Sequence, residues 1–433
     1  HNKKNKTGSL MKSFSLNQIA LVVLCSTLAL TACENKTVST QKTDTKKAIT
    51  IEAQALKIAK ETIIIDTHID VPYRLEHEYE DVSKATAQGD FDYPRAVKGG
   101  LDAPFMSIYI PSSLQKTGGS KALADKLIDD VETIVNQSPN KFALAYSTAQ
   151  VKENFANGII SLPMGMENGS PIEGNLANLQ HFYDRGIRYI TLAHAKTNHI
   201  SDSSYDENRP AQGLTDFGKK LIVAMNNIGV MVDISHVTDQ AFYQVIAISK
   251  VPVIASHSSA RFFTPDFERN MSDEMIKLLA KNGGVIQMTF SGIFTSQKFR
   301  EQSAAYKLVE ADFIKANNLN EEIAADKSKI DAFEEAYDLD HPYDVGTLAL
   351  VLDHFEHVIN LVGIDHVGIG SDFDGVSGIL PDTLKDVSGY PNLIAGLLKR
   401  GYSEQEIEKL LSGNLMRVWQ QVEEYAAKKK KQS

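Results

Sequence analysis

Short apolar runs recur along the chain from residue 51 onward, and stretches long enough for helices separate them. The runs are rich in Val and Ile and almost continuously hydrophobic, which is typical of strands buried on both faces of a parallel sheet. A further short run at 142–146 is interpreted as an accessory element. The predicted strands lie at residues 63–65, 105–110, 160–166, 188–192, 230–234, 252–255, 284–290 and 367–370.

Amphipathic stretches of helical length, such as 176–185 and 215–227, lie between several of these strands. Strands that alternate with helices indicate an α/β protein, and eight such units favour a (β/α)8 TIM-like barrel. We assign residues 51–425 to this barrel, with its active site at the C-terminal strand ends. A charged helical insertion at 294–345 is expected to cover part of the pocket mouth, and residues 426–433 form a basic tail.

The start of the chain has the pattern of a secretory signal. Met11 and Lys12 precede an apolar stretch at 19–30, which is short for a membrane span, and Leu30-Thr31-Ala32-Cys33 follows it. This last sequence resembles the lipobox of bacterial lipoproteins, in which the Cys becomes the lipidated first residue. The alternative is an ordinary signal peptide that happens to contain a Cys.

We therefore expect residues 1–32 to be upstream residues and a lipoprotein signal peptide, with Cys33 as the lipidated residue. Residues 33–50 are polar without an apolar period, so we interpret them as a flexible tether. Glu34 directly after the Cys favours the outer membrane over the inner one. The expected location is the cell envelope, with the protein anchored by lipid and facing the periplasm.

Charge and cysteine content narrow the possible chemistry. The net charge is −10, and removal of residues 1–32, which carry four Lys and no acids, would change it to −14. This acidic balance argues against a nucleic-acid partner. Both Cys lie within the first 33 residues, so the body has no disulfide framework, no Cys-rich zinc finger and no Cys nucleophile. A metal site would have to use His, Asp and Glu.

Residues of metal-ligand type stand at the ends of the predicted strands. Because the carboxyl ends of barrel strands converge on one rim, side chains far apart in the sequence would share one pocket. Singly, each could be a helix cap or a structural histidine, but their coincidence at corresponding strand ends favours a shared metal site. The strand-end residues are His68 and Asp70 in Asp66-Thr67-His68-Ile69-Asp70, Glu167, His194, His236, His257 and Asp372.

Other catalytic patterns are missing from the sequence. It has no G-x-S-x-G elbow, no G-x-G-x-x-G or Walker loop, and no H-E-x-x-H helix. The serines beside His257 are interpreted as support for that histidine. His354 and His357, in an amphipathic helix at 348–361, are predicted to be surface residues, and His366 to lie at the opposite face of the barrel.

Imidazole and carboxylate ligands suit Zn²⁺, and Mn²⁺, Co²⁺ and Fe²⁺ stay open. Three His and three acids exceed what one tetrahedral ion uses, whereas two ions bridged by a carboxylate would use them. Two such ions can hold a hydroxide and polarise a carbonyl, while a neighbouring carboxylate moves the proton. This chemistry implies hydrolysis of an amide or ester by a metal-bridging hydroxide.

Taken together, several motifs in order from about residue 57 to 422 resemble those of the membrane (renal) dipeptidase family and its bacterial relatives. The resemblance implies a binuclear zinc barrel that hydrolyses dipeptides; some members accept a D-amino acid at the C-terminal position or open certain β-lactams. The motifs are Asp66-Thr67-His68-Ile69-Asp70, Gly165-Met166-Glu167-Asn168-Gly169, Thr191-Leu192-Ala193-His194, Val232-Asp233-Ile234-Ser235-His236-Val237, the segment 252–260 around His257, the segment 366–376 around Asp372, and Gly413-Asn414-Leu415-Met416-Arg417-Val418.

The resemblance also implies a metal-binding role for five residues. His68 and Asp70 would bind one zinc, and His236 and His257 would bind the other. Glu167 would bridge the two ions, which makes it part of the catalytic machinery as well.

Substrate contacts are implied in the same way. Asp372 would lie beside the metals, as a ligand and as the group that moves the proton of the bridging water. His194 would contact the scissile carbonyl. Arg269 matches the arginine that holds the substrate's C-terminal carboxylate. Arg261 is its rival, because the spacing from His257 to Arg269 is one residue longer than in the mammalian enzymes.

Two other functions stay open at this point. Another amidohydrolase-like barrel, such as a deaminase or phosphoesterase, would carry His-x-His on the first strand and often a modified Lys, in place of His68-Ile69-Asp70 and Glu167. A solute-binding lipoprotein would need an apolar or ligand-shaped cleft. It would not need a full set of metal ligands. The expected partners are a small dipeptide and, through the lipid, a membrane. A homodimer stays open.

Overall fold

A ring of eight parallel strands forms the centre of the computed structural model, which describes residues 49–320 and 323–432. The order around the ring is β1-β2-β5-β6-β7-β8-β9-β10. Ile69 pairs with Phe373, just beyond the last strand, and thereby closes the ring. The ring strands are β1 (Ile65–Ile69), β2 (Ala103–Tyr109), β5 (Met164–Glu167), β6 (Ile187–Thr191), β7 (Met231–Asp233), β8 (Ile254–Ser258), β9 (Val285–Met288) and β10 (Val367–Ile369).

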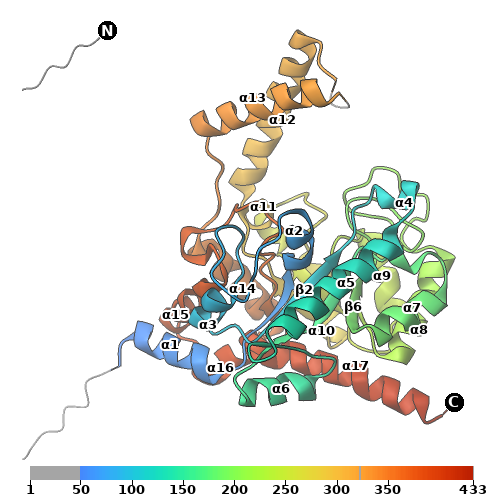
Figure 1. Ribbon diagram of the computed structural model, residues 1–433, viewed down its shortest axis with the longest axis vertical. Coiled ribbons are helices and arrows are strands. Elements are labelled where there is room, and N and C mark those ends of the chain that lie inside the picture. Colours follow the sequence, from blue (N-terminus) through green and yellow to red (C-terminus); the bar gives the residue numbers. More distant parts are fainter. Residues whose placement is uncertain (1–48, 321–322, 433) are drawn as a thin grey trace, which may run out of the picture. The chain divides into compact units, whose positions relative to one another are not determined.

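Helices surround the ring, as Figure 1 shows, so the predicted (β/α)8 barrel is confirmed. Among the described residues, no helix is both long and apolar enough to cross a membrane. The helices are α1 (Ile51–Glu61), α2 (Val71–His77), α3 (Tyr93–Gly99), α4 (Leu114–Thr117), α5 (Ser120–Gln137), α6 (Thr148–Ala156), α7 (Leu176–Asp184), α8 (Asp216–Ile228), α9 (Asp239–Ile248), α10 (Asp273–Lys281), α11 (Gly292–Thr295), α12 (Gln297–Asn317), α13 (Ala324–Asp340), α14 (Leu348–Val362), α15 (Tyr390–Lys399), α16 (Glu404–Glu408) and α17 (Asn414–Lys430).

The structure changes some predicted boundaries. The strand predicted at 160–166 is two strands, because Pro163 lacks a backbone N–H and interrupts the run. Residues before it form β4 (Ile160–Leu162), which pairs with β3 (Phe142–Leu144) in a separate two-stranded sheet. The last helix, α17, also continues across the expected boundary between 425 and 426. The predicted signal peptide, Cys33 and nearly all of the predicted tether lie outside the described residues.

One end of the barrel interior is filled by aromatic side chains. Trp419 of α17 is fully buried, and its ring lies 5.3 Å from the ring of Phe105 on β2. Phe105 in turn lies 5.5 Å from Tyr189 on β6. Such close-packed rings exclude water and give the interior strands fixed positions. The clustered His, Asp and Glu side chains lie toward the other end, where the strands finish.

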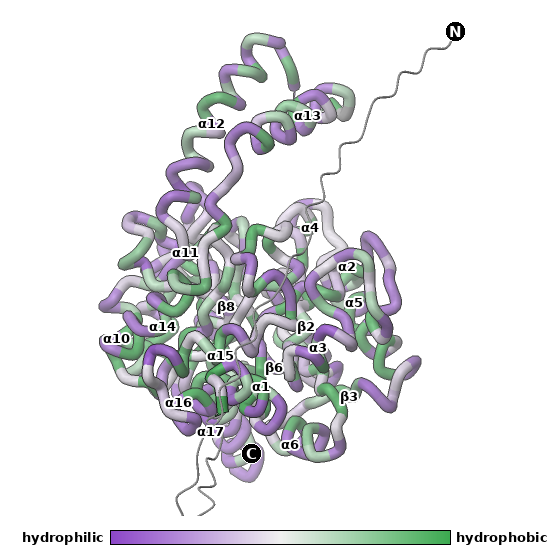
Figure 2. The backbone as a smooth tube through the Cα atoms, turned by 90° about the vertical axis from the view of Figure 1, so that its left-hand side faces the viewer, coloured by the Kyte–Doolittle hydropathy of each residue, from purple (hydrophilic) through white to green (hydrophobic). Residues whose placement is uncertain are grey.

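The insertion at 294–345 contains the helices α12 and α13, which form a hairpin that projects from the barrel (Figures 1 and 2). The hairpin is held together by its own aromatic contacts, including the stacked rings of Phe313 and Phe333, whose centroids lie 4.0 Å apart. The rings of Tyr306 and Tyr337 also make contact, tilted by 50° with their centroids 5.2 Å apart. Only the base of the hairpin therefore lies close to the strand ends.

His354 corrects one prediction, because this histidine on α14 is completely buried and not at the surface. Its Nδ1 accepts a hydrogen bond from the backbone N–H of Ala260 at 3.1 Å, and its Nε2 donates to the carbonyl oxygen of Thr295 at 3.2 Å. It thereby ties α14 to the loop after β8 and to the end of α11. Burial lowers the pKa of His354 to about 4.

This buried imidazole predicts a pH-dependent stability. The folded pKa of about 4 lies below the unfolded value of 6.5, so the stabilisation is complete above pH 6.5 and is lost as the pH falls to 4. The loss amounts to about 3 kcal/mol. Urea unfolding between pH 7 and 4 measures it, with His354→Gln as control, because Gln can make both hydrogen bonds without titrating. Equal pH slopes in the two proteins would contradict the assignment.

Candidate metal centre

His68 and Asp70 meet Glu167 at the carboxyl ends of β1 and β5. The Nε2 atom of His68 lies 3.4 Å from Oδ2 of Asp70 and 3.4 Å from Oε2 of Glu167. All three side chains are buried. Neither Nε2 of His68 nor Oδ1 of Asp70 has a hydrogen-bond partner. The three donor atoms therefore face one another with unused lone pairs, as in a cation site.

A second set of donors lies on the other oxygen of the same carboxylate. The Nε2 atoms of His236 and His257, from the ends of β7 and β8, are each 3.2 Å from Oε1 of Glu167 and 2.9 Å from one another. Both imidazoles are buried. Glu167 thus presents one oxygen to each set, and groups of three ligand atoms in this cluster lie within 4.8 Å of one another.

The electrostatics of the cluster also fit cations. Burial alone would raise the pKa of Glu167, but the imidazoles of His194 and His68 and hydrogen bonds from His236 and His257 hold that pKa well below its ordinary value. Burial lowers the pKa of His236 and His257 and keeps their rings neutral, the form that binds metals. The residues present therefore fit divalent cations with nitrogen and oxygen ligands.

Asp372 reaches the cluster from the loop after β10. Its backbone has φ 68°, a left-handed conformation that is strained for a residue with a side chain. Gly375 makes room for it, because a Cβ at this position would lie 2.4 Å from Oδ1 of Asp372 and 2.3 Å from Oδ2 of Asp70. Burial raises the pKa of Asp372 to about 8. The loop therefore holds a basic carboxylate against the other ligands.

His194 and Arg269 form the edge of the cluster. Nε2 of His194 lies 3.7 Å from Oε1 of Glu167, and its ring lies 4.3 Å from that of His236. Arg269 is 3% exposed, and one of its N–H groups donates to the carbonyl of His257 at 2.8 Å. Its Nε and Nη1 have no partner, so this buried cation is available to an anion.

Arg261, the rival of Arg269, has a different environment. Its guanidinium pairs with both carboxylate oxygens of Asp239, at 2.8 and 2.5 Å, and donates to the backbone carbonyls of Glu268 and Asn270. These bonds occupy the fork that would hold a carboxylate. Of the two arginines, only Arg269 has buried, unpartnered N–H groups beside the cluster.

Comparisons with known proteins agree with a metal centre formed by these residues. A family model described as membrane dipeptidase (peptidase family M19) matches residues 52–433. The chain is 30% identical over 393 residues to Dipeptidase 3 of Mus musculus, which covers 88% of this chain and 69% of the mouse protein. The chain belongs to the membrane dipeptidase family. Membership of this metallopeptidase family makes it a metal-dependent hydrolase.

Three further matches also extend over more than four fifths of this chain. An uncharacterized dipeptidase of Schizosaccharomyces pombe is 30% identical over 377 residues, 83% of this chain and 81% of the yeast protein. The fold matches the probable dipeptidase PvdM from Pseudomonas aeruginosa with a TM-score of 0.74 at 24% identity, covering 87% of this chain and 99% of that one. A metallo peptidase from Rhodobacter sphaeroides matches with a TM-score of 0.67 at 24% identity, covering 84% and 100%.

Residues outside the predicted ligand set support this dipeptidase-family site. The hydroxyl of Tyr189 lies 2.9 Å from Nδ1 of His68 and fixes the ring of that ligand. The hydroxyl of Ser256 lies 2.8 Å from Nδ1 of His257. The same hydroxyl donates a hydrogen bond to Oδ2 of Asp233 at 2.6 Å. Such outer partners orient metal ligands. The contact of Ser256 agrees with the interpretation of the serines beside His257 as support, whereas nothing in the sequence alone points to Tyr189.

Gly165 tests the role of Tyr189. A Cβ on Gly165 would lie 2.0 Å from Cζ of the Tyr189 ring, so Gly165→Ala must displace the ring and its hydroxyl from His68. We expect metal affinity to fall by roughly 10- to 100-fold, as for loss of other outer partners. Metal titration measures the effect. Tyr189→Phe, which keeps the ring and removes the hydroxyl, should reproduce it, and wild-type affinity in both variants would exclude the role.

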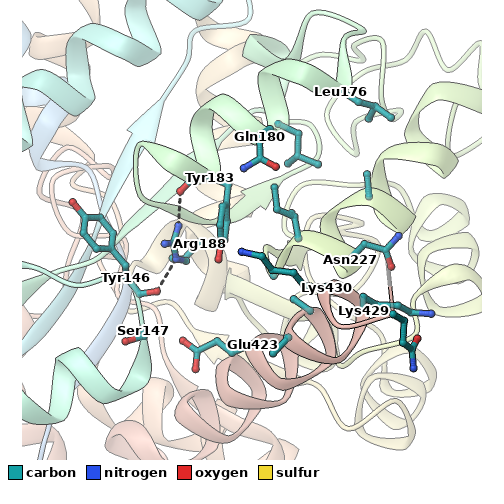
Figure 3. Close-up of a pocket in the computed structure, with 17 residues that line it drawn as sticks. Tyr146, Ser147, Leu176, Gln180, Tyr183, Arg188, Asn227, Glu423, Lys429 and Lys430 are labelled. Atoms are coloured by element: carbon teal, nitrogen blue, oxygen red, sulfur yellow. Dashed lines mark hydrogen bonds between the residues drawn. The ribbon is translucent and has the colours of Figure 1, made fainter.

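A separate cavity of about 1080 Å³ lies between α7, α8 and α17, away from the cluster (Figure 3). Arg188, near the start of β6, points into it between Tyr146 and Tyr183. The guanidinium donates to the backbone carbonyls of these two tyrosines at 2.7 and 2.8 Å. Its bonds therefore hold the loop at Tyr146 and the end of α7 together, and none of the clustered metal-type residues lines this cavity.

Proposed function

We propose that the chain is a zinc-dependent dipeptidase that holds two Zn²⁺ ions. The observation that carries the proposal is the position of Glu167, whose oxygens face two separate donor sets. His68 and Asp70 would hold one ion, and His236 and His257 the other. Nitrogen and oxygen donors of this kind suit Zn²⁺, and Mn²⁺, Co²⁺ and Fe²⁺ are compatible with them.

Bound divalent cations would supply Lewis acidity and lower the pKa of a water molecule. The residues of the chain would position the substrate and move protons. Asp372 would accept the proton of the attacking water and deliver it to the leaving amine. His194, at the edge of the cluster, would donate a hydrogen bond to the carbonyl oxygen as that oxygen gains negative charge.

Dipeptide length follows from the position of Arg269. One of its Nη atoms lies 3.1 Å from Nε2 of His236, so an anchored carboxylate stays close to the cluster. A carboxylate anchor this close to the cluster would limit the substrate to a single residue beyond the scissile bond. The Rhodobacter sphaeroides metallo peptidase was solved with a phosphinate mimic of the dipeptide L-Ala-D-Ala. We extend the proposal to dipeptides with a D-amino acid at the C-terminal position.

A panel of dipeptides with D- and L-residues at the C-terminal position tests the function. The protein is assayed after chelation and again after addition of zinc, while bound metal is measured by elemental analysis. The expected result is hydrolysis that chelation removes and zinc restores, with two metals per chain. Fewer than one tightly bound metal, together with no chelator-sensitive cleavage of any dipeptide, would overturn the proposal.

The position of Arg269 predicts that the enzyme prefers substrates with a free C-terminal carboxylate. We expect Arg269→Gln to lower kcat/KM for dipeptides by roughly 100-fold, mainly through KM, because the charge-assisted bonds to the carboxylate are lost. The measurement compares each free dipeptide with its C-terminal amide. The wild type should strongly prefer the acid, and the variant should lose that preference.

Arg261→Gln is the matched control for this experiment. Since Arg261 pairs with Asp239, its loss should lower thermal stability and leave the preference for the free acid in place. If the preference for the free acid disappeared in Arg261→Gln and persisted in Arg269→Gln, Arg261 and not Arg269 would be the residue that binds the substrate carboxylate.

We also propose that Cys33 is lipidated and anchors the enzyme to the cell envelope, with the body facing the periplasm. The support is the lipobox-like Leu30-Thr31-Ala32-Cys33. Mass spectrometry of the N-terminal peptide from membranes should show an acylated Cys33, and Cys33→Ala should release the protein from the membrane fraction. An unmodified Cys33 in the membrane-bound protein would exclude this anchor.

A further inference from the structure

The base of the helical hairpin places a second arginine near the metal cluster. Arg300 lies in the first turn of α12, and the Cζ of its guanidinium is 3.5 Å from the centroid of the Phe267 ring. The residue is half-buried. In the described part of the chain, no carboxylate forms an ion pair with Arg300, in contrast to Arg261 and Arg400, which both pair with acids.

An aromatic wall connects this cation with Arg269. The rings of Phe267 and Phe294 lie 6.4 Å apart and almost parallel, at 9°. Arg300 lies over Phe267, while the Cζ of Arg269 lies 5.0 Å from the centroid of Phe294. Stacking on an aromatic ring holds a guanidinium flat and leaves its N–H edge open to other partners.

Tyr205 shows that the wall faces the cluster. Its ring lies 5.7 Å from that of His236 and 6.2 Å from that of Phe267. Burial raises the pKa of Tyr205, and the charges of Arg269 and Arg300 oppose this rise. The hydroxyl therefore lies within electrostatic reach of both arginines. Arg300 stands on the same wall as the anchor, on the side of the hairpin.

The substrate chemistry follows from two cations at different depths. A dipeptide whose C-terminal carboxylate is held by Arg269 beside Phe294 would have its C-terminal side chain near the neighbouring ring of Phe267, on which Arg300 stacks. We propose that Arg300 is a specificity residue that selects dipeptides whose C-terminal residue is Asp or Glu. This inference rests on the proposed dipeptidase function and names its substrate class. A planar guanidinium fits the added carboxylate with two parallel hydrogen bonds.

The experiment uses pairs of dipeptides that differ only in charge, Gly-Glu with Gly-Gln and Gly-Asp with Gly-Asn, in L- and D-forms. For the wild type with added zinc, we expect kcat/KM for the acidic member to exceed that for the amide by roughly 10-fold or more in the preferred stereochemical form. The ratio should decrease as salt is raised, because the half-exposed ion pair is screened.

In Arg300→Gln the acid-to-amide ratio should fall close to one, and Arg300→Lys should restore part of it. The ratio is taken within each protein, so a general loss of activity does not change it. Lys298→Gln is the matched control, because it removes the same charge from an exposed position in the same turn of α12. It should keep the wild-type ratio.

The outcomes separate this inference from the function on which it rests. If the wild type cleaves acidic and neutral dipeptides with equal efficiency, the specificity inference is wrong and the dipeptidase function stands. A ratio that survives in Arg300→Gln, or that falls equally in Lys298→Gln, also overturns the inference. If no dipeptide is cleaved with zinc present, the proposed function fails and the inference fails with it.

Discussion

Asp372→Asn should abolish nearly all dipeptide hydrolysis while the protein keeps its metals. Asn has the same shape but neither accepts a proton from water nor passes one to the leaving amine, so kcat should fall by roughly 1,000-fold. The other ligand atoms, on His68, Asp70 and Glu167, remain in place. Steady-state kinetics and elemental analysis on the same sample measure the two effects separately.

Asp374→Asn is the control. Asp374 is a buried carboxylate in the same loop, and its side chain faces away from the cluster. Its oxygens accept hydrogen bonds from Arg74 at 3.1 Å and from the backbone of Asp90 at 2.5 Å. Its loss should lower stability more than catalysis. Full activity of Asp372→Asn would remove Asp372 from the mechanism. A loss of metal equal to the loss of activity would assign it a ligand role only.

The strand-end residues could be predicted from the sequence because all strands of a parallel barrel end at the same face, so the residues that follow them lie close together. His68, Glu167, His236 and His257 end strands separated by almost 200 residues, yet their donor atoms lie within a few ångströms. The apolar runs identify the strands. The carboxyl end of each strand is then enough to predict which side chains meet at the rim of the barrel. The members of the cluster are thus predictable without any knowledge of the helices between them.

The same reasoning placed His68 directly after its strand, whereas β1 runs from Ile65 to Ile69 and includes it. Polar residues are tolerated inside this strand because neighbours satisfy them. Asp66 accepts hydrogen bonds from the hydroxyl of Tyr390 at 2.6 Å and from the backbone of Ser371 at 3.0 Å. An apolar period cannot show such partners, since they come from distant parts of the sequence.

Contacts between distant loops explain the other residues that the sequence did not reveal. His354 has the spacing of an exposed helical residue, but the loop after β8 and the end of α11 cover it and supply both of its hydrogen bonds. Arg300 belongs to a charged helix with no sign of a site, and it becomes relevant only because Phe267 lies under it. In both cases the tertiary neighbour, and not the helix itself, decides the role of the side chain.

Glu167→Ala should prevent stable binding of both metals and leave no measurable hydrolysis. The substitution removes a carboxylate whose two oxygens each face one of the donor sets, so each ion would lose a ligand in a single change. Loss of an outer partner alone costs roughly 10- to 100-fold in metal affinity, so loss of a shared ligand should cost more. Metal titration should show weakened binding at both sites, and zinc should no longer raise the melting temperature.

Glu423→Gln provides the matched control, because Glu423 is a half-buried carboxylate on α17 that bonds to Thr148, remote from the cluster. It should retain both metals and full activity. If Glu167→Ala lost one metal and kept the second with wild-type affinity, Glu167 would belong to a single site. The two donor sets would then act independently, since a bridging carboxylate cannot be removed from one ion without being removed from the other.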